Sequence, residues 1–261
     1  MDTITATVTG ARHLRVARNG QDAAVAAAGA SPSGAGWTAA VVCDGCSAGA
    51  SSEVGARLGA ALALASLVRR LAVGDPVGPD LWAGVRREVI EALAALVDRM
   101  GEDRVQIVVD HFLFTIVAAA ATRERAEVWA IGDGAYAFGG HTHRLGPFAD
   151  NQPPSTHQLG PFADNQPPYL GYALLGDEPP AHVEAAPAGT RTIAIGTDGA
   201  LELAGGLARF TEPRYLQHAD RARRELAVLA RGREVIEWDA RRVVRTAELH
   251  DDCAIAVVRV P

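Results

Sequence analysis

Three apolar runs of this chain end in the same dipeptide, Asp-Gly. The runs are predicted β-strands, and the dipeptides that follow them are Asp44-Gly45, Asp133-Gly134 and Asp198-Gly199. Two further predicted strands begin just after aspartates, one after Asp22 and the other after Asp251-Asp252. Because the end of one strand lies beside the start of its neighbour in an antiparallel sheet, this pattern predicts that all five sites converge at one edge of the sheet structure.

Carboxylates gathered in this way repel one another, and they stay ionised only where cations compensate their charge. Oxygen ligands suit Mg²⁺ or Mn²⁺ better than a soft metal. Two such ions close together can activate a water molecule and hold a phosphoryl oxygen. A single Asp-Gly is an ordinary turn dipeptide, so it is the recurrence after apolar runs that favours a metal centre.

The alternation of apolar runs and helical patterns predicts an α+β fold, with a core of two antiparallel sheets flanked by helices. Helices are expected from Ser52 to Leu71, from Asp80 to about Met100 and around Pro213 to Leu229, each with helix-spaced apolar residues or a capping residue at its start. The predicted strands are Thr3–Val8, Asp22–Ala28, Gly36–Cys43, Phe112–Thr122, Ala126–Gly132, Ala135–Gly140, Arg191–Gly196 and Cys253–Val260. No linker divides the chain, so residues 1–261 are expected to form a single domain.

Ten residues, LGPFADNQPP, occur twice, at Leu145–Pro154 and Leu159–Pro168. A Pro-rich segment with so few apolar residues cannot build a core of its own. The sequence therefore predicts an exposed loop at about residues 141–172. A duplication in a tolerant surface loop is the favoured interpretation, and a flap that faces the substrate is the other.

Charge and cysteine content exclude several classes of protein. The 25 Lys and Arg against 31 Asp and Glu give a net charge of −6, which argues against a nucleic-acid binder. Three cysteines cannot form a disulfide framework, and Cys43-x-x-Cys46 lacks the further ligands of a zinc site; Cys43 is predicted to be a buried strand residue. Without a signal peptide or a long apolar run, we expect a cytoplasmic protein with no membrane contact.

The order of motifs resembles the metal-dependent protein phosphatases of the type 2C serine/threonine class, and in particular a bacterial branch of it. Gly10-Ala11-Arg12-His13, followed by Gln21-Asp22, is similar to the opening motif of that branch. The matching motifs that follow are VVCDGCSAGASSEVGARL (Val41–Leu58), WAIGDGAYAF, PPYLGY (Pro167–Tyr172), AIGTDGALEL and DDCAIAVV. The similarity extends over nearly the whole chain in the right order.

This resemblance implies an αββα sandwich, two central antiparallel β-sheets flanked by helix pairs, with a binuclear Mn²⁺/Mg²⁺ centre. By position, Asp44 would bridge both ions, with the Gly45 carbonyl as a further ligand. Asp198 and Asp251 would bind the first metal and Asp22 the second, while Asp133 and Asp198 resemble the pair that binds a third, weaker ion. Asp44 and Asp198 are therefore candidate catalytic residues, and His13, Arg15 or Arg18 would orient the phosphoryl group.

The implied activity is hydrolysis of phosphoserine and phosphothreonine in proteins, opposing a serine/threonine kinase, by an enzyme expected to be a monomer. The chain departs from the family pattern at Gln21, where many members carry Glu, and at Cys46, where some carry His. Its Gly-Asp-Gly-Ala motif also lacks the Arg of the common G-D-S-R form, and the Arg that often contacts phosphate has no exact counterpart. These departures motivate an alternative, a pseudophosphatase or regulatory module that binds phosphopeptides or partners without turnover. Hydrolysis of a small phosphorylated metabolite by the same centre is a third possibility.

Overall fold

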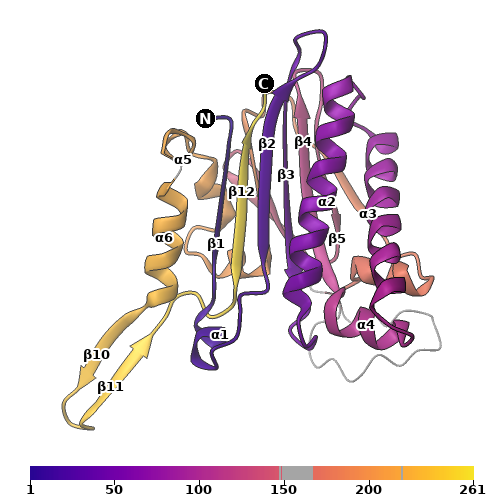
Figure 1. The fold of residues 1–261 in the computed structure, drawn as a ribbon. Coiled ribbons are helices and arrows are strands. Elements are labelled where there is room, and N and C mark those ends of the chain that lie inside the picture. The colour runs from indigo at the N-terminus through magenta and orange to yellow at the C-terminus, as the bar shows by residue number, and fades with distance from the viewer. Residues whose placement is uncertain (147, 149–166, 219) are drawn as a thin grey trace.

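Twelve strands, six α-helices and three 3₁₀ helices make up the computed structural model, which describes residues 1–146, 148, 167–218 and 220–261. Most of the duplicated segment lies outside these residues. Ten of the strands form two five-stranded antiparallel sheets (Figure 1). The first sheet has the order β1 (Thr3–Val8), β12 (Cys253–Arg259), β9 (Thr192–Gly196), β6 (Gly134–Phe138) and β7 (His141–Leu145). The second has the order β2 (Ala23–Ala30), β3 (Gly36–Gly45), β4 (Phe114–Thr122), β5 (Ala126–Ile131) and β8 (His182–Ala185).

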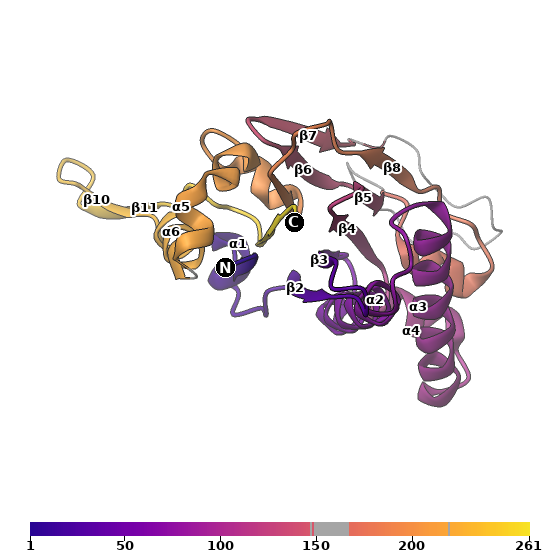
Figure 2. The ribbon, with the colours of Figure 1, turned by 90° about the horizontal axis from the view of Figure 1, so that it is seen from above.

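The two sheets pack face to face through small and β-branched side chains. Val42 and Val117 of the second sheet meet Ile193, Ile195 and Ala256 of the first in one buried cluster. Alternate residues of the same strands point outward to the helices, because side chains alternate between the faces of a strand. The end-on view shows the two sheets stacked at the centre of the molecule (Figure 2).

Helices cover the outer face of each sheet, which confirms the predicted αββα sandwich. Helices α2 (Ser52–Val73) and α3 (Pro79–Met100) cover the second sheet, and α4 (Arg104–His111) lies beside them. Helices α5 (Pro213–Gln217) and α6 (Asp220–Arg231) cover the first sheet, together with η2 (Asp198–Glu202) and η3 (Leu207–Thr211). Within the described ranges, no helix combines the length and the apolar character needed to cross a bilayer.

Most predicted elements are present, with a residue or two of difference at their ends. The main unpredicted elements are α4, in the stretch before β4, the short strands β7 and β8 at the sheet edges, and the hairpin of β10 (Arg233–Glu237) and β11 (Arg242–Thr246) between α6 and β12. Helix α4 begins after Asp103, whose side chain accepts a hydrogen bond from the Gln106 N–H at 3.0 Å. The edge strands β7 (HTHRL) and β8 (HVEA) are short and polar, so their sequences lack the apolar alternation by which a strand is recognised.

The two ends of the predicted loop at 141–172 are ordered elements. Residues His141–Leu145 form β7, and η1 (Leu170–Leu175) is a 3₁₀ helix whose Leu170, Tyr172 and Leu174 are buried. The start of the repeated sequence at Leu145 thus belongs to a strand. The final Pro-Pro of its second copy leads directly into η1.

The carboxylate of Glu88, which is partly buried, links α3 to α2 through hydrogen bonds. It accepts hydrogen bonds from the Ser66 hydroxyl at 2.6 Å and from the guanidinium groups of Arg69 and Arg70 at 2.7 and 2.5 Å. These contacts, the Ser66 hydrogen bond first, lower the pKa of Glu88 from 4.5 to about 2. A carboxylate whose pKa is lowered by folding stabilises the protein above its unfolded pKa, and that contribution is lost as the pH falls toward its folded pKa.

We therefore expect Glu88→Gln to lower the free energy of unfolding by about 1 kcal/mol at pH 7. The difference from wild type should shrink as the pH falls from about 4.5 to 2. Urea unfolding at several pH values measures both. Glu91→Gln, on the same helix but in a 3.9 Å contact with Arg87 at the surface, is the matched control and should change stability by less than about 0.5 kcal/mol. Equal effects of the two variants would contradict the role given to Glu88.

Candidate metal and phosphate site

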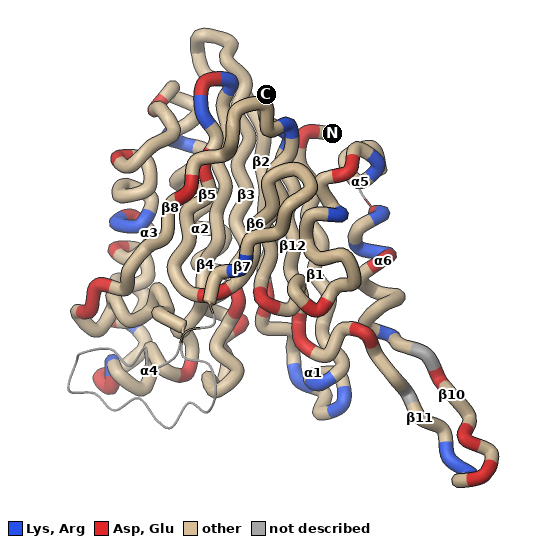
Figure 3. Tube along the Cα trace, turned by 180° about the vertical axis from the view of Figure 1, so that it is seen from behind, with Lys and Arg blue, Asp and Glu red and all other residues tan. Residues whose placement is uncertain are grey.

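The five aspartate positions do converge. Asp44 lies at the end of β3, Asp133 between β5 and β6, Asp198 directly after β9, and Asp251 just before β12. These four side chains line one pocket of about 300 Å³. The other described residues that line it are Arg12, His13, Gln21, Gly45, Cys46, Ser47, Pro167, Tyr169 and Asp252. Figure 3 shows acidic residues gathered at this end of the sheets.

Asp22 lies beneath the pocket, at the start of β2. Its side chain is buried, accepts a hydrogen bond from the Thr197 hydroxyl at 2.6 Å and is hydrogen-bonded to Asp44. Its second oxygen, Oδ1, is buried and has no hydrogen-bond partner within the described part of the chain. A buried carboxylate oxygen without a partner is costly, so Asp22 Oδ1 is a candidate ligand for a cation.

The surroundings of the cluster disfavour the ionised form of its carboxyl groups. Burial raises the pKa of Asp22 and of Asp44, and repulsion from neighbouring aspartates raises both further. Burial, followed by repulsion from Asp133 and Asp251, raises the pKa of Asp198 to about 6. The acidic donors of the pocket are carboxylate oxygens, beside the side chain of Cys46, and this set fits a hard divalent cation that would offset the repulsion.

Among the described residues, no group of three His, Cys, Asp or Glu side chains surrounds a common point where it could hold a metal ion. Asp22 and Asp44 bond to each other instead. The unpartnered Asp22 Oδ1 and the raised pKa values of Asp22, Asp44 and Asp198 are the observations by which these residues fit a divalent cation.

Asp252, the neighbour of Asp251, organises the loop before β2. It is buried and accepts the Gly10 N–H at 2.7 Å, the Gln21 N–H at 2.6 Å and the His13 Nδ1–H at 2.7 Å. Three donors on one carboxylate fix the chain on both sides of α1 (Ala11–Arg15). The two neighbouring aspartates differ in burial: the Asp251 side chain is 41% exposed, and that of Asp252 is 3% exposed.

Two glycines allow this close packing. A Cβ at Gly10 would lie 2.2 Å from the Asp251 carbonyl carbon, and a Cβ at Gly199 would lie 1.9 Å from the Asp252 carbonyl oxygen. Any larger residue at either position would push the loops away from the start of β12. The Gly199 of the third Asp-Gly motif is therefore required by the packing of the site.

The basic residues predicted to contact phosphate take different places. His13 lines the pocket, as does Arg12, which lies 3.8 Å from Asp251. Arg18 instead donates to the carbonyls of Ser47 and Gly49 at 2.8 and 2.5 Å, so it holds the loop after β3. Arg15 lines a second pocket, between α1 and α6. Spacing along the chain could not separate these residues, because the turn of α1 alone decides which of them faces the carboxylates.

Gln21 and Cys46 belong to the wall of the site. The Gln21 amide donates to the Cys46 carbonyl at 3.2 Å and to the Ser52 hydroxyl, and that hydroxyl also donates to the Cys46 carbonyl at 2.7 Å. A glutamate could not donate these bonds, so the neutral side chain has a structural role here. Cys43 is fully buried in β3 as predicted, and burial raises the pKa of its thiol.

Tyr169, absent from the sequence-based candidates, completes the pocket. It follows Pro167 and Pro168, packs edge-on against Tyr172 with ring centroids 5.7 Å apart and hydrogen-bonds to Cys46. Burial, with the nearby Cys46 and carboxylates, raises its pKa, so the phenol stays protonated and can donate a hydrogen bond. The PPYLGY motif was the available signal for it.

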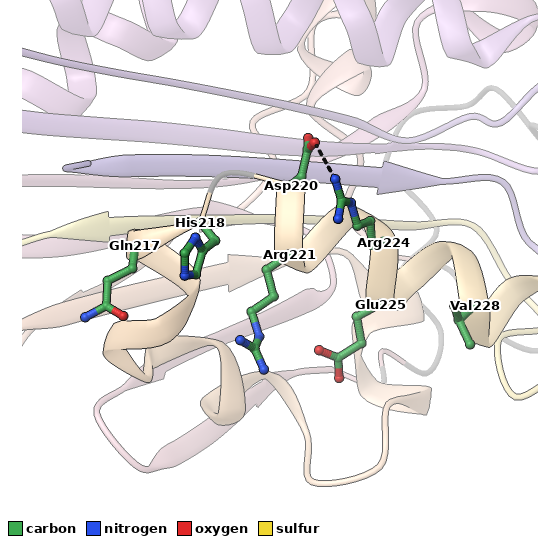
Figure 4. Close-up of a pocket in the computed structure, with 7 residues that line it drawn as sticks. All are labelled: Gln217, His218, Asp220, Arg221, Arg224, Glu225 and Val228. Carbon is green, nitrogen blue, oxygen red and sulfur yellow. Dashed lines mark hydrogen bonds and ion pairs between the residues drawn. The ribbon is translucent and has the colours of Figure 1, made fainter.

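A larger pocket between α5 and α6 does not share these properties (Figure 4). Its charged groups pair with one another or with nearby residues: Arg224 lies 3.4 Å from Asp220, and Glu225 accepts the Tyr215 hydroxyl at 2.8 Å. Asp220, Arg224 and Glu225 are thus compensated by their neighbours. The carboxylate pocket is therefore the candidate site.

Comparison with known proteins agrees with this geometry. The family model of protein phosphatase 2C matches residues 9–228, which is most of the chain. The chain belongs to the protein phosphatase 2C family. No individual curated protein matches its sequence.

Solved structures of bacterial phosphatases share the protein phosphatase 2C fold with this chain. Stp1 from Staphylococcus aureus matches with a TM-score of 0.56 and 11% identity over 100% of this chain and 96% of its own. The S. agalactiae serine/threonine phosphatase gives 0.52 and 15% over 100% and 99%. PppA from Pseudomonas aeruginosa, described as a regulatory component of T6SS, gives 0.54 and 16% over 98% and 96%. At such low identities the likeness concerns the fold.

The contrast between Asp251 and Asp252 yields a prediction. Asp252→Asn should lower the free energy of unfolding by about 2–3 kcal/mol, because it weakens three hydrogen bonds to a buried carboxylate. Asp251→Asn, at a half-exposed neighbour, should change metal-free stability by less than about 0.5 kcal/mol. Denaturant unfolding of the metal-free proteins measures both values. The interpretation is wrong if Asp251→Asn is the more destabilising variant.

Proposed function

We propose that this chain is a metal-dependent protein serine/threonine phosphatase that hydrolyses phosphoserine and phosphothreonine. The single observation that carries this proposal is the convergence of acidic side chains, from five separate places in the sequence, in and beneath one pocket that also has basic residues at its rim. Family membership supports the reaction type. The acidic residues are Asp22, Asp44, Asp133, Asp198 and Asp251.

The proposed cofactor is Mn²⁺ or Mg²⁺, as two ions with a third, weaker one. Asp44 would bind both principal ions, with the Gly45 carbonyl as a further ligand; Asp198 and Asp251 would bind the first ion and Asp22 the second. Asp133 and Asp198 would hold the third. When bound, such ions neutralise charge on phosphoryl oxygens and activate water for attack on phosphorus.

Arg12 and His13 would bind and orient the phosphoryl group. The Nδ1–H of His13 is donated to Asp252, which fixes the ring and leaves Nε2 for a ligand in the pocket. Arg12 is 70% exposed at the rim, where its guanidinium can donate two parallel hydrogen bonds to a phosphate. We therefore assign this task to Arg12 and His13 in place of Arg15.

The proposed substrate is a phosphorylated protein, with a serine/threonine kinase as the opposing enzyme. The pocket rim is open, since Arg12, Ser47 and Asp251 are exposed or half-exposed. Such an open rim can admit a phosphorylated side chain that remains attached to its protein. A comparison of phosphopeptides with sugar phosphates and free phospho-amino acids separates this substrate class from small metabolites.

The alternative, a binding module without turnover, rested on Gln21 and on the residue after the central Asp-Gly. The hydrogen bonds of Gln21 to Cys46 and Ser52 give this residue a structural role that does not depend on loss of catalysis. All the aspartates of the cluster are in place. These observations favour the enzyme.

The acidic cluster predicts opposite effects of Asp44→Asn on stability and on activity. Removal of one buried, repelling charge should raise the free energy of unfolding of the metal-free protein by about 1–2 kcal/mol. The same variant should lose the stabilisation that wild type gains from Mn²⁺, which is about 2.7 kcal/mol at a concentration 100 times the dissociation constant. Thermal unfolding with and without Mn²⁺ gives both values, and hydrolysis of p-nitrophenyl phosphate should fall by at least about 100-fold.

Glu124→Gln, at the exposed turn between β4 and β5, is the control for removal of one negative charge. Wild-type hydrolysis should also depend on Mn²⁺ or Mg²⁺ and stop in EDTA. A folded wild type that is stabilised by Mn²⁺ but inactive toward p-nitrophenyl phosphate and phosphopeptides would favour the binding module. Full activity in EDTA would contradict the proposal.

The two arginines of α1 test the phosphate contact. Arg12→Ala should reduce kcat/KM for p-nitrophenyl phosphate about ten-fold more than Arg15→Ala does, mainly through KM, because a charged hydrogen bond to phosphate contributes roughly 1.5–3 kcal/mol. Steady-state kinetics of the two variants decides between the residues. A larger loss in Arg15→Ala would show that the sequence-based expectation was the better one.

A further inference from the structure

The hydroxyl of Thr197 connects the two sheets at the carboxylate cluster. Thr197 follows the last residue of β9 in the first sheet, and Asp22 directly precedes β2 of the second sheet. The Thr197 hydroxyl donates to Asp22 Oδ2 at 2.6 Å, and both side chains are buried. This hydrogen bond joins two segments that are 175 residues apart in the sequence, and one of them carries a proposed metal ligand.

Strand pairing fixes the direction of this hydrogen bond. The backbone N–H of Ala254, on β12, donates to the Thr197 hydroxyl oxygen at 2.9 Å. The hydroxyl has a single hydrogen of its own to donate. The other acceptor near it, the Ala254 carbonyl, lies at 3.5 Å and already accepts the Thr197 N–H at 3.0 Å. The hydroxyl hydrogen is therefore directed to Asp22.

This bond holds one oxygen of Asp22 and leaves the other open. Oδ2 accepts the Thr197 hydroxyl, while Oδ1 is the buried oxygen that has no hydrogen-bond partner among the described residues. The Asp22 side chain is also hydrogen-bonded to Asp44, which is itself a proposed ligand of both principal ions. Thr197 is thus the partner that Asp22 would keep when both carboxylates bind metal. Partners of this kind orient metal ligands and increase metal affinity.

We propose that Thr197 is a positioning residue for the second metal ion, because it orients the carboxylate of Asp22. This inference rests on the proposed function, in which Asp22 is a ligand of that ion. Thr197 is not among the described residues that line the pocket, so it acts through Asp22 and does not touch the substrate. Its neighbour Asp198 is a proposed ligand of the first ion. The dipeptide Thr197-Asp198 would therefore serve both ions.

A purely structural role of the hydroxyl is the alternative. The same hydroxyl completes the pairing of β9 with β12 by accepting the Ala254 N–H, so its removal lowers the stability of the chain under either interpretation. Metal affinity distinguishes them. A positioning residue affects the binding step in which Asp22 takes part, whereas a structural role does not single out one step.

Titration calorimetry of the metal-free chain with Mn²⁺ measures these affinities without any turnover. Asp22→Asn identifies the binding step to which Asp22 contributes. Thr197→Val, which keeps the shape of the side chain but cannot donate, should weaken that same step by about 10- to 100-fold. The other step should stay within about two-fold of wild type, as expected for independent sites.

Thr197→Ser tests the hydroxyl separately from the shape of the side chain. Serine keeps the donor but loses the restriction that a β-branched residue places on its χ1 angle. It should bind Mn²⁺ in the affected step more nearly like wild type than like Thr197→Val. If Thr197→Val does not fold, Thr197→Ala also lacks the hydroxyl and should show the same loss of affinity.

Thr38→Val is the matched control. Thr38 is another buried strand threonine, and its hydroxyl donates to the Arg259 carbonyl at 2.7 Å, but it lies near the start of β3, whereas Asp44 lies near its end. Loss of this hydrogen bond should lower the melting temperature by about 3 °C. Both Mn²⁺ affinities should stay within about two-fold of wild type.

The outcomes separate this inference from the proposed function. Equal Mn²⁺ affinities in wild type and Thr197→Val, an equal loss in both binding steps, or a loss of the same size in Thr38→Val would overturn the role of Thr197 and leave the phosphatase proposal as it stands. A folded wild type that binds no Mn²⁺ would contradict the proposed cofactor, and the role of Thr197 with it.

Discussion

Repulsion among carboxylates at one end of the two sheets is the constraint on which the rest of this structure depends. Asp44, Asp133 and Asp198 lie at or near strand ends and line the same pocket. Burial raises the pKa of Asp44 and of its neighbour Asp22. Such a cluster costs stability in any state that lacks a cation. The surrounding fold must therefore be rigid enough to hold it together. The Val, Ile and Ala layer between the sheets gives this rigidity, because it packs the strands that carry the aspartates directly against each other.

Asp252 has a structural role in the site that differs from the ligand role proposed for the other aspartates. It is the carboxylate of the site that satisfies three donors of the chain itself. It thereby connects the start of β12 with the loop that carries Arg12, His13 and Gln21, across some 230 residues of sequence. The adjacent Asp251 lines the pocket, and one of its oxygens accepts the Asp252 N–H at 2.9 Å. Two neighbouring residues of one type thus differ in role because the strand that follows places one inside and one outside.

Sequence patterns could predict the sheets and the acidic cluster because both follow from short-range regularities. Apolar runs that end in Asp-Gly fix where each strand stops, and antiparallel pairing brings those ends together. The basic residues are different. Arg12, Arg15 and Arg18 lie within seven positions. The turn of α1 places Arg12 at the carboxylates and Arg15 at another groove, whereas Arg18 follows the end of α1 and contacts the loop after β3. No periodicity in the sequence distinguishes these outcomes, since they depend on how α1 rests on the Leu249 and His250 carbonyls.

The hairpin of β10 and β11 could not be predicted from the sequence either, for a different physical reason. Its strands mix charged and apolar residues on both faces, so no alternation marks an inner side. That lack of an inner side is itself informative. A strand of a folded domain has one face for its own core, whereas β10 and β11 have an apolar pair on each face and no core of their own to contact. β10 and β11 therefore present apolar side chains at the surface of the described structure.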